Sequence, residues 1–370
     1  MRRRGKIDRL AMVGTTGKKN AQIREHLAAG VGAYNGIDTN ADIYPEDGVE
    51  KDYEAYKAAI DSMKPGDGVT IFTPDDTHFD IALYAIQHKL HVLIAKPSVK
   101  TVEKQSILIQ EARKNGVICG VEFHKRFDPM YADAALRMPL LGDFSFYSSY
   151  MAQPKAQLLT FRSWAGKSSD ISYYLNSHHI DIHTWGVKDI AVPISVTASA
   201  ATGVATKAPY SCVEGTEDTI TLLVKWRNIH SGNLGTAVYT SSWIAPKGDV
   251  HTQQYFHYMG HTGELRIDQA HRGYTSALDD AAYASHNPLY IRYTPDDKGN
   301  YVGQGCYSHR SIEEWADACA KVNEGKITVQ EAERLIPTIE SSAVVTAILE
   351  AGRKSLDAGG VTVEIEKYDV

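Results

Sequence analysis

The sequence is poor in cysteine and has no long apolar run. Its four cysteines are far apart and include no CxxC pair, which favours reduced thiols over a disulfide framework. No segment approaches the roughly 20 consecutive apolar residues that a membrane-spanning helix requires. The basic start, residues 1–6, resembles the beginning of a signal peptide, but Asp8 and Arg9 interrupt the apolar segment that has to follow. We therefore expect a cytoplasmic protein with no membrane contact.

An excess of positive charge is also missing. The formal net charge is -6 and the pI is near 6.2. The chain therefore has no broad electrostatic attraction for a phosphate backbone, and nucleic acid is not an expected partner. No internal repeat or low-complexity stretch is present. The 370 residues exceed one ordinary core at about 150 residues per domain, which favours two domains.

The first third of the chain alternates short apolar runs with helical patterns. Tyr53, Tyr56, Ile60 and Met63 recur at spacings of three and four residues, which gives one expected helix an apolar face. Such alternation builds a parallel sheet covered by helices, here an N-terminal doubly wound sheet of the Rossmann type. The expected strands are residues 10–13, 69–72, 91–94 and 117–121.

After Asp128 the pattern changes to that of an antiparallel sheet. Ile220, Leu222 and Val224 alternate with polar residues, as expected of a strand with one buried face. The chain is thus expected to form two domains, residues 1–127 and 128–370, the second an α+β domain with a large, open, mainly antiparallel sheet. Further strands are expected at residues 144–150, 237–243, 253–259 and 265–267, and helices at 311–322 and 339–356.

A glycine turn follows the first expected strand. Gly14, Thr15, Thr16 and Gly17 precede a helical run, an arrangement in which backbone N–H groups and a helix N-terminus meet a pyrophosphate. The full GxGxxG spacing is absent, because Thr16 and Lys19 occupy the second and third glycine positions. The turn predicts a dinucleotide site, with an ordinary strand-to-helix turn as the alternative.

An acidic residue follows at the distance that a dinucleotide site requires. Asp38 lies 24 residues after Gly14, near the end of the expected second strand, close to the offset of about 20 residues at which an acid binds the ribose 2′-hydroxyl. Its charge repels a 2′-phosphate, so the cofactor predicted is NAD rather than NADP. A plain loop aspartate is the alternative, and Asp42 is a rival for the same role.

Three motifs carry a resemblance to a known family. In order along the chain they are Thr73-Pro74-Asp75-Asp76-Thr77-His78, Ala95-Lys96-Pro97, and Val121-Glu122-Phe123-His124-Lys125-Arg126-Phe127-Asp128-Pro129. They resemble the T-P-N/D-x-x-H, E-K-P and V-G-F-N-R-R-F-x-P motifs of the Gfo/Idh/MocA family of sugar and inositol dehydrogenases. The resemblance covers nearly the whole chain. It implies that Thr73, Pro74, Asp75, His78 and Lys96 line the cofactor.

Lys96 is the first predicted catalytic residue. It ends an expected parallel strand, at the edge of the sheet where ligands collect, and its charge suits a forming alkoxide. A surface lysine in a salt bridge is the alternative. The resemblance implies a cis bond between Lys96 and Pro97. Ala95 departs from the motif, which has glutamate there.

His178 is the second predicted catalytic residue, a general base in a helix that runs to about residue 187. The resemblance supplies a D-x-x-x-H-x-x-D pattern, which matches His178 and Asp181 but places Tyr174 at the first aspartate. Histidine suits proton transfer because its unperturbed pKa is about 6.5. Asp181 is expected to bind substrate hydroxyls or the imidazole. His179 is the alternative base and a candidate substrate contact.

Other residues are weaker candidates for the substrate site. His179 and His183 have the spacing of two metal ligands on a helix, but no third ligand is evident, so no metal is expected. Arg162, Trp164 and His124 are candidate substrate contacts, and Tyr174 is expected to face the substrate. Trp243 and Tyr307 could stack on a sugar ring or belong to the core.

These residues predict an NAD-dependent oxidoreductase that moves a hydride between nicotinamide and a hydroxyl-bearing carbon. The Tyr174-Leu175-Asn176-Ser177-His178-His179-Ile180-Asp181 run looks similar to a branch that oxidises C3 of glucosides, with inositol and aldose oxidation as alternatives. A non-catalytic NAD-binding sensor and a metal-dependent hydrolase or lyase are alternatives of other classes. The family also implies homo-oligomers formed through the open face of the second sheet.

Overall fold

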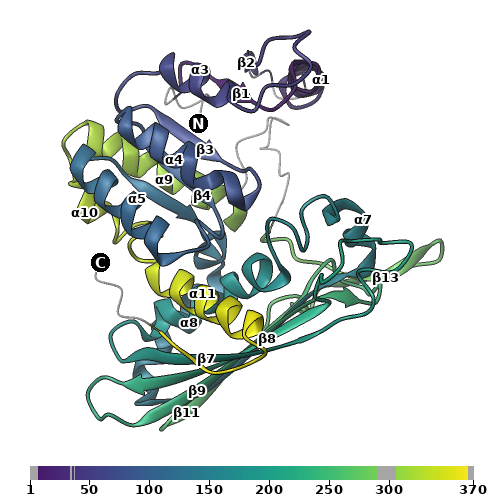
Figure 1. Ribbon diagram of the computed structural model, residues 1–370, viewed down its shortest axis with the longest axis vertical. Coiled ribbons are helices and arrows are strands. Elements are labelled where there is room, and N and C mark those ends of the chain that lie inside the picture. Colours follow the sequence, from purple (N-terminus) through teal and green to yellow (C-terminus); the bar gives the residue numbers. More distant parts are fainter. Residues whose placement is uncertain (1–6, 34–35, 37, 291–305, 366–370) are drawn as a thin grey trace.

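The computed structural model describes residues 7–33, 36, 38–290 and 306–365. A small parallel sheet with flanking helices lies above a large, mainly antiparallel sheet, and the helices of the second sheet lie between the two (Figure 1). This is the predicted combination of a Rossmann-type domain and an α+β domain. The basic segment at residues 1–6 lies outside the described residues.

The best-formed part of the first sheet has the strand order β3-β4-β5, all parallel. The central strand β4 is apolar and almost entirely buried, because helices and neighbouring strands surround it. Helices α4 and α5 cover one face. The element bounds are β3 Gly68–Ile71, α4 His78–Gln87, β4 His91–Ala95, α5 Val102–Asn115 and β5 Cys119–Glu122. The three strands expected here are confirmed to within two residues.

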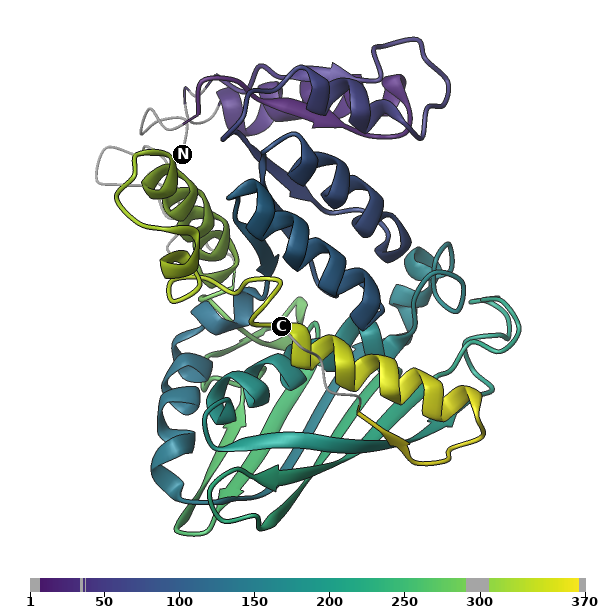
Figure 2. The same cartoon turned by 60° about the vertical axis from the view of Figure 1, so that its left-hand side comes forward.

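The first two strands form a separate piece. β1 (Ala11–Val13) pairs in parallel with β2 (Asp42–Tyr44), and the sheet order joins neither to β3. Figure 2 shows this pair, with α1 (Gly17–Leu27) and α3 (Ala55–Asp61), lying at the far end of the domain. The parallel strands of the first domain are therefore divided between two short sheets. β1 has three residues and Val13 is 48% exposed, so it offers little apolar surface to a third strand.

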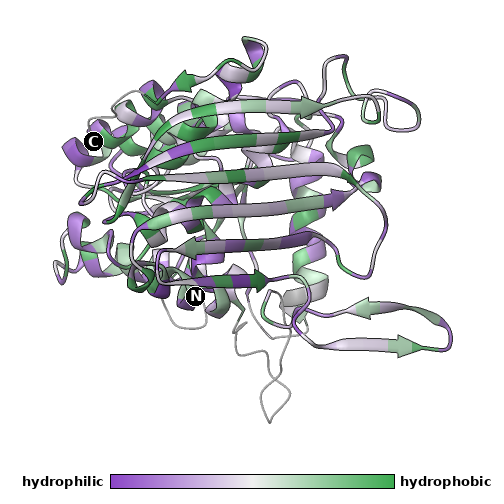
Figure 3. Cartoon of the chain, turned by 90° about the horizontal axis from the view of Figure 1, so that it is seen from below, coloured by the Kyte–Doolittle hydropathy of each residue, from purple (hydrophilic) through white to green (hydrophobic). Residues whose placement is uncertain are grey.

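The second sheet has seven strands in the order β11-β10-β6-β9-β8-β7-β14. All neighbours are antiparallel except β6 and β9, which are parallel. Helices α8 (Ser177–Val187) and α11 (Ala343–Asp357) cover one face, whereas Figure 3 shows the other face with no helix across it. The strands are β6 Phe144–Pro154, β7 Ala191–Ala201, β8 Thr219–Asn228, β9 Leu234–Ala245, β10 Gln253–Gly260, β11 Gly263–Asp268 and β14 Val363–Glu364.

A small hairpin and several helices complete the described part of the chain. A small hairpin, β12 (Thr275–Leu278) and β13 (Ala281–Ser285), projects from the second domain. The other helices are α6 Pro129–Arg137, α7 Leu158–Phe161, α8 Ser177–Val187, α9 Tyr307–Asn323, α10 Val329–Ala332 and α11 Ala343–Asp357. Every helix in the described residues is too short or too polar to cross a membrane. The four cysteines are free and buried.

The chain returns to the first sheet near its end. Trp315 on α9 packs with Leu93 and Ile118, and its indole Nε1–H donates to the Val92 carbonyl at 3.1 Å. Figure 1 shows α9 and α10 beside β3 and β4. Residues 128–370 are therefore not confined to the second sheet, and the division at residue 127 stays a prediction.

Replacing Trp315 with alanine should destabilise the first domain strongly. The side chain is 5% exposed, and its removal leaves a cavity against β4 and β5, which typically costs about 3–5 kcal/mol of unfolding free energy. Urea denaturation measures the loss. Leu140→Ala, at a side chain that is 76% exposed, is the control and should leave the midpoint unchanged. An unchanged midpoint for Trp315→Ala would contradict the packing of α9 on this sheet.

Candidate active site

Lys96 lies directly after β4, and the Lys96–Pro97 peptide bond is cis, as the resemblance implied. Its ammonium donates a hydrogen bond to the carbonyl of Tyr174 and lies 4.0 Å from the centroid of the Tyr174 ring. Burial lowers the pKa of Lys96 to about 8, although Asp75 and Glu122 favour the charged form. The first domain thus presents a buried amine to the second.

The turn after β3 lies beside this lysine. Burial raises the pKa of Asp75, while Ser169, His78 and Lys96 oppose that rise. Thr77 Oγ1 donates to the Pro74 carbonyl at 2.8 Å and lies 2.7 Å from Thr73 Oγ1, which closes the turn. The predicted turn therefore lies next to Lys96, as the order of the motifs suggested.

His78 has a structural position. One ring nitrogen, Nε2, lies 2.9 Å from the Thr73 carbonyl, and Nδ1 lies 2.9 Å from the Pro97 carbonyl. The side chain is fully buried. Both nitrogens face protein carbonyls, so the prediction that His78 binds the cofactor directly is wrong. It holds the two motif turns together.

His178 is the site residue that the second domain contributes from the start of α8. A π-helical segment, Ser172–Asn176, leads into α8, so the Tyr174 carbonyl that Lys96 contacts lies one turn before His178. The His178 Nδ1 atom is buried and has no hydrogen-bond partner among the described residues. Burial lowers the pKa of His178 well below its ordinary value, and Lys96, Lys125 and His124 lower it further. Lys96 and His178 therefore lie within electrostatic reach of each other.

Asp181 is already paired. Arg126 donates to both carboxylate oxygens, from Nε at 2.9 Å and from Nη2 at 2.6 Å. Burial raises the pKa of Asp181, and Arg126 opposes that rise. Arg126 takes one position on each carboxylate oxygen, so its pairing with Asp181 is the contact that the structure shows, and a contact of Asp181 with substrate hydroxyls stays a prediction. The sequence analysis missed Arg126, although the residue lies in the third motif.

His179 and His183 point into the core. His179 Nε2 lies 2.9 Å from the Tyr131 hydroxyl, and His183 Nδ1 lies 2.6 Å from the Tyr239 hydroxyl. Burial lowers the pKa of each to about 3. His179 is thus neither the alternative base nor a substrate contact. No group of three metal-ligating side chains occurs in the described part of the chain.

The aromatic candidates gather around Tyr174. Trp164, Trp243 and Phe161 surround it, with ring centroids 5.2, 6.0 and 5.3 Å from the Tyr174 ring. Trp243 is fully buried and donates from Nε1 to the Glu217 carbonyl, so it belongs to the core. Arg162 is exposed and lies near Cys212, whose pKa burial raises and Arg162 lowers.

His124 lies beside His178, with ring centroids 5.1 Å apart. Its Nδ1 is 2.8 Å from a carboxylate oxygen of Glu122, at the end of β5. Tyr307 stacks on the His124 ring, with ring centroids 5.8 Å apart. The sequence analysis named His124 and Tyr307 but missed Glu122. The available signal was a glutamate where the V-G-F motif has glycine.

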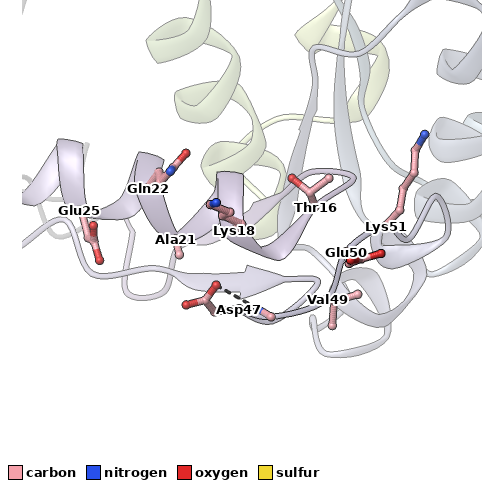
Figure 4. A pocket seen from close by; sticks show the side chains of 10 residues that line it. Thr16, Lys18, Ala21, Gln22, Glu25, Asp47, Val49, Glu50 and Lys51 are labelled. Atoms are coloured by element: carbon pink, nitrogen blue, oxygen red, sulfur yellow. Dashed lines mark hydrogen bonds between the residues drawn. The ribbon is translucent and has the colours of Figure 1, made fainter.

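The glycine turn lies in the β1–β2 piece, beside a pocket of about 780 Å³. Figure 4 shows this pocket, lined by Thr16, Lys18 and Asp47 among others. The Gly14 and Gly17 N–H groups donate to the carbonyls of Tyr44 and Val49, so neither is available for a phosphate. A Cβ at Gly17 would lie 1.8 Å from the Glu46 carbonyl oxygen, which explains the glycine.

Asp38 lies away from this turn. It precedes β2 and lines a different pocket, of about 380 Å³, with Arg24 and Asn40. The prediction that it lies near the end of the second strand is therefore wrong. Glu46 and Asp47 follow that end, and Asp47 lies in the pocket with Thr16. Asp42 lies within β2 and pairs with Arg9.

Together the fold and the site define a two-domain protein with a Rossmann-type domain and a lysine–histidine site at the end of its parallel strands. Comparisons with known proteins agree. Residues 9–123 match the oxidoreductase family with an NAD-binding Rossmann fold, Gfo/Idh/MocA. This match confirms the resemblance inferred from the motifs for the N-terminal part of the chain, where the family model describes an NAD-binding Rossmann fold.

Curated relatives resemble the same part of the chain. A scyllo-inositol 2-dehydrogenase (NAD(+)) of Bacillus subtilis is 37% identical over 105 residues, 28% of this chain and 31% of that protein. A UDP-N-acetylglucosamine 3-dehydrogenase of Acidithiobacillus ferrooxidans is 30% identical over 117 residues, 32% of this chain and 36% of that protein. The matched region spans about a third of each relative.

Solved structures resemble the whole chain in fold. The scyllo-inositol dehydrogenase of Lactobacillus casei with NAD(H) and scyllo-inositol has a TM-score of 0.64 and 18% identity, covering 96% of this chain and 98% of that one. The myo-inositol 2-dehydrogenase of Lactobacillus plantarum has a TM-score of 0.60 and 19% identity, covering 97% and 99%. The second domain therefore shares the fold of these dehydrogenases.

The buried Arg126–Asp181 pair supports a stability prediction. Arg126→Met leaves the Asp181 carboxylate buried without a partner, which costs about 3–5 kcal/mol of unfolding free energy. The double variant Arg126→Met, Asp181→Leu should recover most of this loss, because no unpaired charge remains. Urea denaturation compares the variants. Arg137→Ala, which breaks the exposed pair with Asp133, is the control, and an equal loss in the single and double variants would contradict the argument.

Proposed function

We propose that this chain is an NAD-dependent oxidoreductase that transfers a hydride between the cofactor and a secondary hydroxyl carbon of a sugar or cyclitol. The observation that carries the proposal is the hydrogen bond from Lys96 to the Tyr174 carbonyl, which lies one turn before His178. The lysine comes from the carboxyl end of β4 in the NAD-binding domain, and the histidine comes from the second domain. Ligands of open α/β sheets bind at that end of the strands.

At the glycine turn, the start of α1 and the Thr16 and Lys18 side chains fit the phosphate end of NAD, whereas the Gly14 and Gly17 N–H groups are already bound to carbonyls. Helix α1 begins at Gly17 beside the pocket, and Thr16 and Lys18 line it. A helix N-terminus and a lysine both attract a pyrophosphate. Asp47 is better placed than Asp38 to receive the adenosine ribose, because it follows the carboxyl end of β2. Bound NAD supplies the hydride acceptor.

At the reacting end, this chain supplies charge and shape. Lys96 donates to the substrate oxygen and stabilises the negative charge that develops there. The Tyr174 ring and carbonyl hold the ammonium in place. His178, whose Nδ1 has no hydrogen-bond partner among the described residues, is an imidazole of the second domain that the Lys96 charge affects. Thr73, Pro74 and Asp75 border the lysine.

We propose C3 of a glucoside as the oxidised position, which gives a 3-keto sugar. The run from Tyr174 to Asp181 supports this choice, and the UDP-N-acetylglucosamine 3-dehydrogenase is a relative of the N-terminal domain. Inositol and aldose oxidation are the alternatives within the family, and the inositol dehydrogenases among the similar proteins support the first of them. A non-catalytic NAD-binding sensor has no need of Lys96 and His178 together. A metal-dependent hydrolase or lyase needs a cluster of metal-ligating side chains, and the described residues contain no such group of three.

We also propose a cytoplasmic homo-oligomer formed through the open face of the second sheet. Leu223 and Tyr255, from β8 and β10, are 47% and 48% exposed. Exposed apolar side chains on a broad sheet face favour contact with a second copy.

A panel of glucosides, free aldoses and inositols with NAD tests the function. We expect reduced cofactor to form with at least one glucoside, followed by its absorbance, and a 3-keto product identified by NMR. Reduction of NAD by inositols alone would replace the substrate proposal but keep the reaction class. No hydride transfer with any member, in a protein that binds NAD, would contradict the oxidoreductase proposal.

Lys96→Ala should lower turnover by a factor of about 10²–10³, since it removes the donor to the developing oxyanion. NAD affinity, measured by calorimetry, should change little. Lys114→Ala is the matched control, because Lys114 is an exposed lysine on α5. Unchanged turnover in Lys96→Ala would end the assignment of this lysine.

A further inference from the structure

Glu122 and His124 form a carboxylate–imidazole pair inside the site. Glu122 ends β5 and His124 follows it two residues later, with Nδ1 and Oε2 2.8 Å apart. The side chains are 10% and 15% exposed. Ser311 on α9 donates to the other oxygen of Glu122 at 2.7 Å. The carboxylate is therefore fixed from both sides, and it holds the imidazole through Nδ1–H.

This orientation leaves Nε2 of His124 as the acceptor nitrogen. An imidazole that donates from Nδ1 to a carboxylate keeps its lone pair on Nε2, and the carboxylate stabilises the imidazolium that forms when Nε2 takes a proton. Tyr307 stacks on the His124 ring at an interplanar angle of 11°, so this contact also restricts the orientation of the imidazole. The pair has the parts that a general base requires.

His178 lacks those parts. Its Nδ1 has no hydrogen-bond partner among the described residues, and Tyr174 stands where a supporting aspartate was expected. Burial and the neighbouring charges of Lys96 and Lys125 keep the pKa of His178 well below its ordinary value. A neutral imidazole of this kind is a weak proton acceptor but a suitable hydrogen-bond partner for the substrate oxygen.

We propose, as a step that rests on the proposed function, that His124 held by Glu122 is the general base of this site and that His178 is a neutral partner of the substrate oxygen. In oxidation the alcohol O–H bond breaks and its proton passes to Nε2 of His124. The oxygen keeps the electron pair of the O–H bond and uses it to form the C=O bond. The hydride leaves the carbon for NAD, the acceptor in the proposed function. The imidazolium later returns its proton to water.

The surroundings of the pair match this role. Glu122 is the register partner of Ala95 on the neighbouring strand, so its carboxylate stands beside the residue before Lys96. The pair faces Lys96 directly after β4, His178 and Asp181 on α8, Tyr307 on α9, and Tyr290. Lys125, the next residue, also feels the Glu122 charge.

Four variants test the proposal: His124→Gln, His178→Gln, Glu122→Gln and the control Glu264→Gln. Glu264 pairs with His257 at 2.8 Å on the exposed β10–β11 hairpin, so its variant breaks a similar pair away from the site. The pH dependence of kcat/KM is the kinetic measurement. We expect the acidic limb to disappear in His124→Gln, with a loss of about 10²–10⁴-fold in turnover. In Glu122→Gln the limb should move to lower pH, because the imidazolium loses its anionic partner.

His178→Gln and Glu264→Gln should retain the acidic limb, the first with weaker activity and the second with unchanged activity. A limb that persists in His124→Gln and disappears in His178→Gln would overturn the proposal. An unmoved limb in Glu122→Gln would overturn the role of the carboxylate. Urea denaturation confirms that each variant is folded, and His124→Gln tests the proposal even if Glu122→Gln does not fold.

A second readout does not depend on activity. NMR of ring-labelled histidines in the intact protein follows the protonation of each imidazole. The His124 signal is identified by its absence in His124→Gln. We expect this signal to titrate at lower pH in Glu122→Gln, and we expect the His178 ring to remain neutral. If the panel finds no substrate but the titration behaves in this way, the oxidoreductase proposal fails and the pair remains. A titrating His178 and a Glu122-independent His124 would overturn the pair itself.

Discussion

The site depends on keeping one ammonium group inside the protein. Moving a lysine out of water is costly, and the structure offsets this cost with a carbonyl and an aromatic ring from Tyr174 and with two carboxylates, Asp75 and Glu122. The three residues that supply these groups come from three different elements. Because Lys96 needs all of them, the turn after β3, the end of β5 and the π-helical entry to α8 must converge on the end of β4. The contact between the two domains is therefore also the site.

The carboxylates of this chain are distributed differently from the motifs that it resembles. Ala95 replaces the glutamate before the lysine, and Tyr174 replaces the aspartate before the histidine. Glu122 stands on the strand beside Ala95, and Asp181 is bound by Arg126. A carboxylate bound by a guanidinium on both oxygens positions the helix rather than the substrate. The charge that remains next to an imidazole is that of Glu122.

The second half of the chain supports the site from two directions. The large sheet carries α8 and α11 between itself and the first domain (Figure 2). Helix α9 then returns to the first sheet, where Trp315 packs and where Tyr307 and Ser311 reach His124 and Glu122. This return makes the end of the chain part of the site. A residue far away in sequence thus completes the surroundings of β5.

By itself, the sequence determined the class of the fold, most strands and helices, and the two motif turns beside Lys96, because hydrophobic spacing and short motifs act locally. The alternation at Ile220, Leu222 and Val224 places β8, and the T-P-D and K-P turns end β3 and β4 as expected. Local patterns do not specify partners. Only the tertiary structure decided that Arg126 takes Asp181, that Tyr131 takes His179, that β1 and β2 stand apart from β3, and that Glu122 faces His124. Those outcomes depend on which side chains come into contact when distant segments pack together. Burial then shifts the pKa values of these side chains and so determines which of them stay charged.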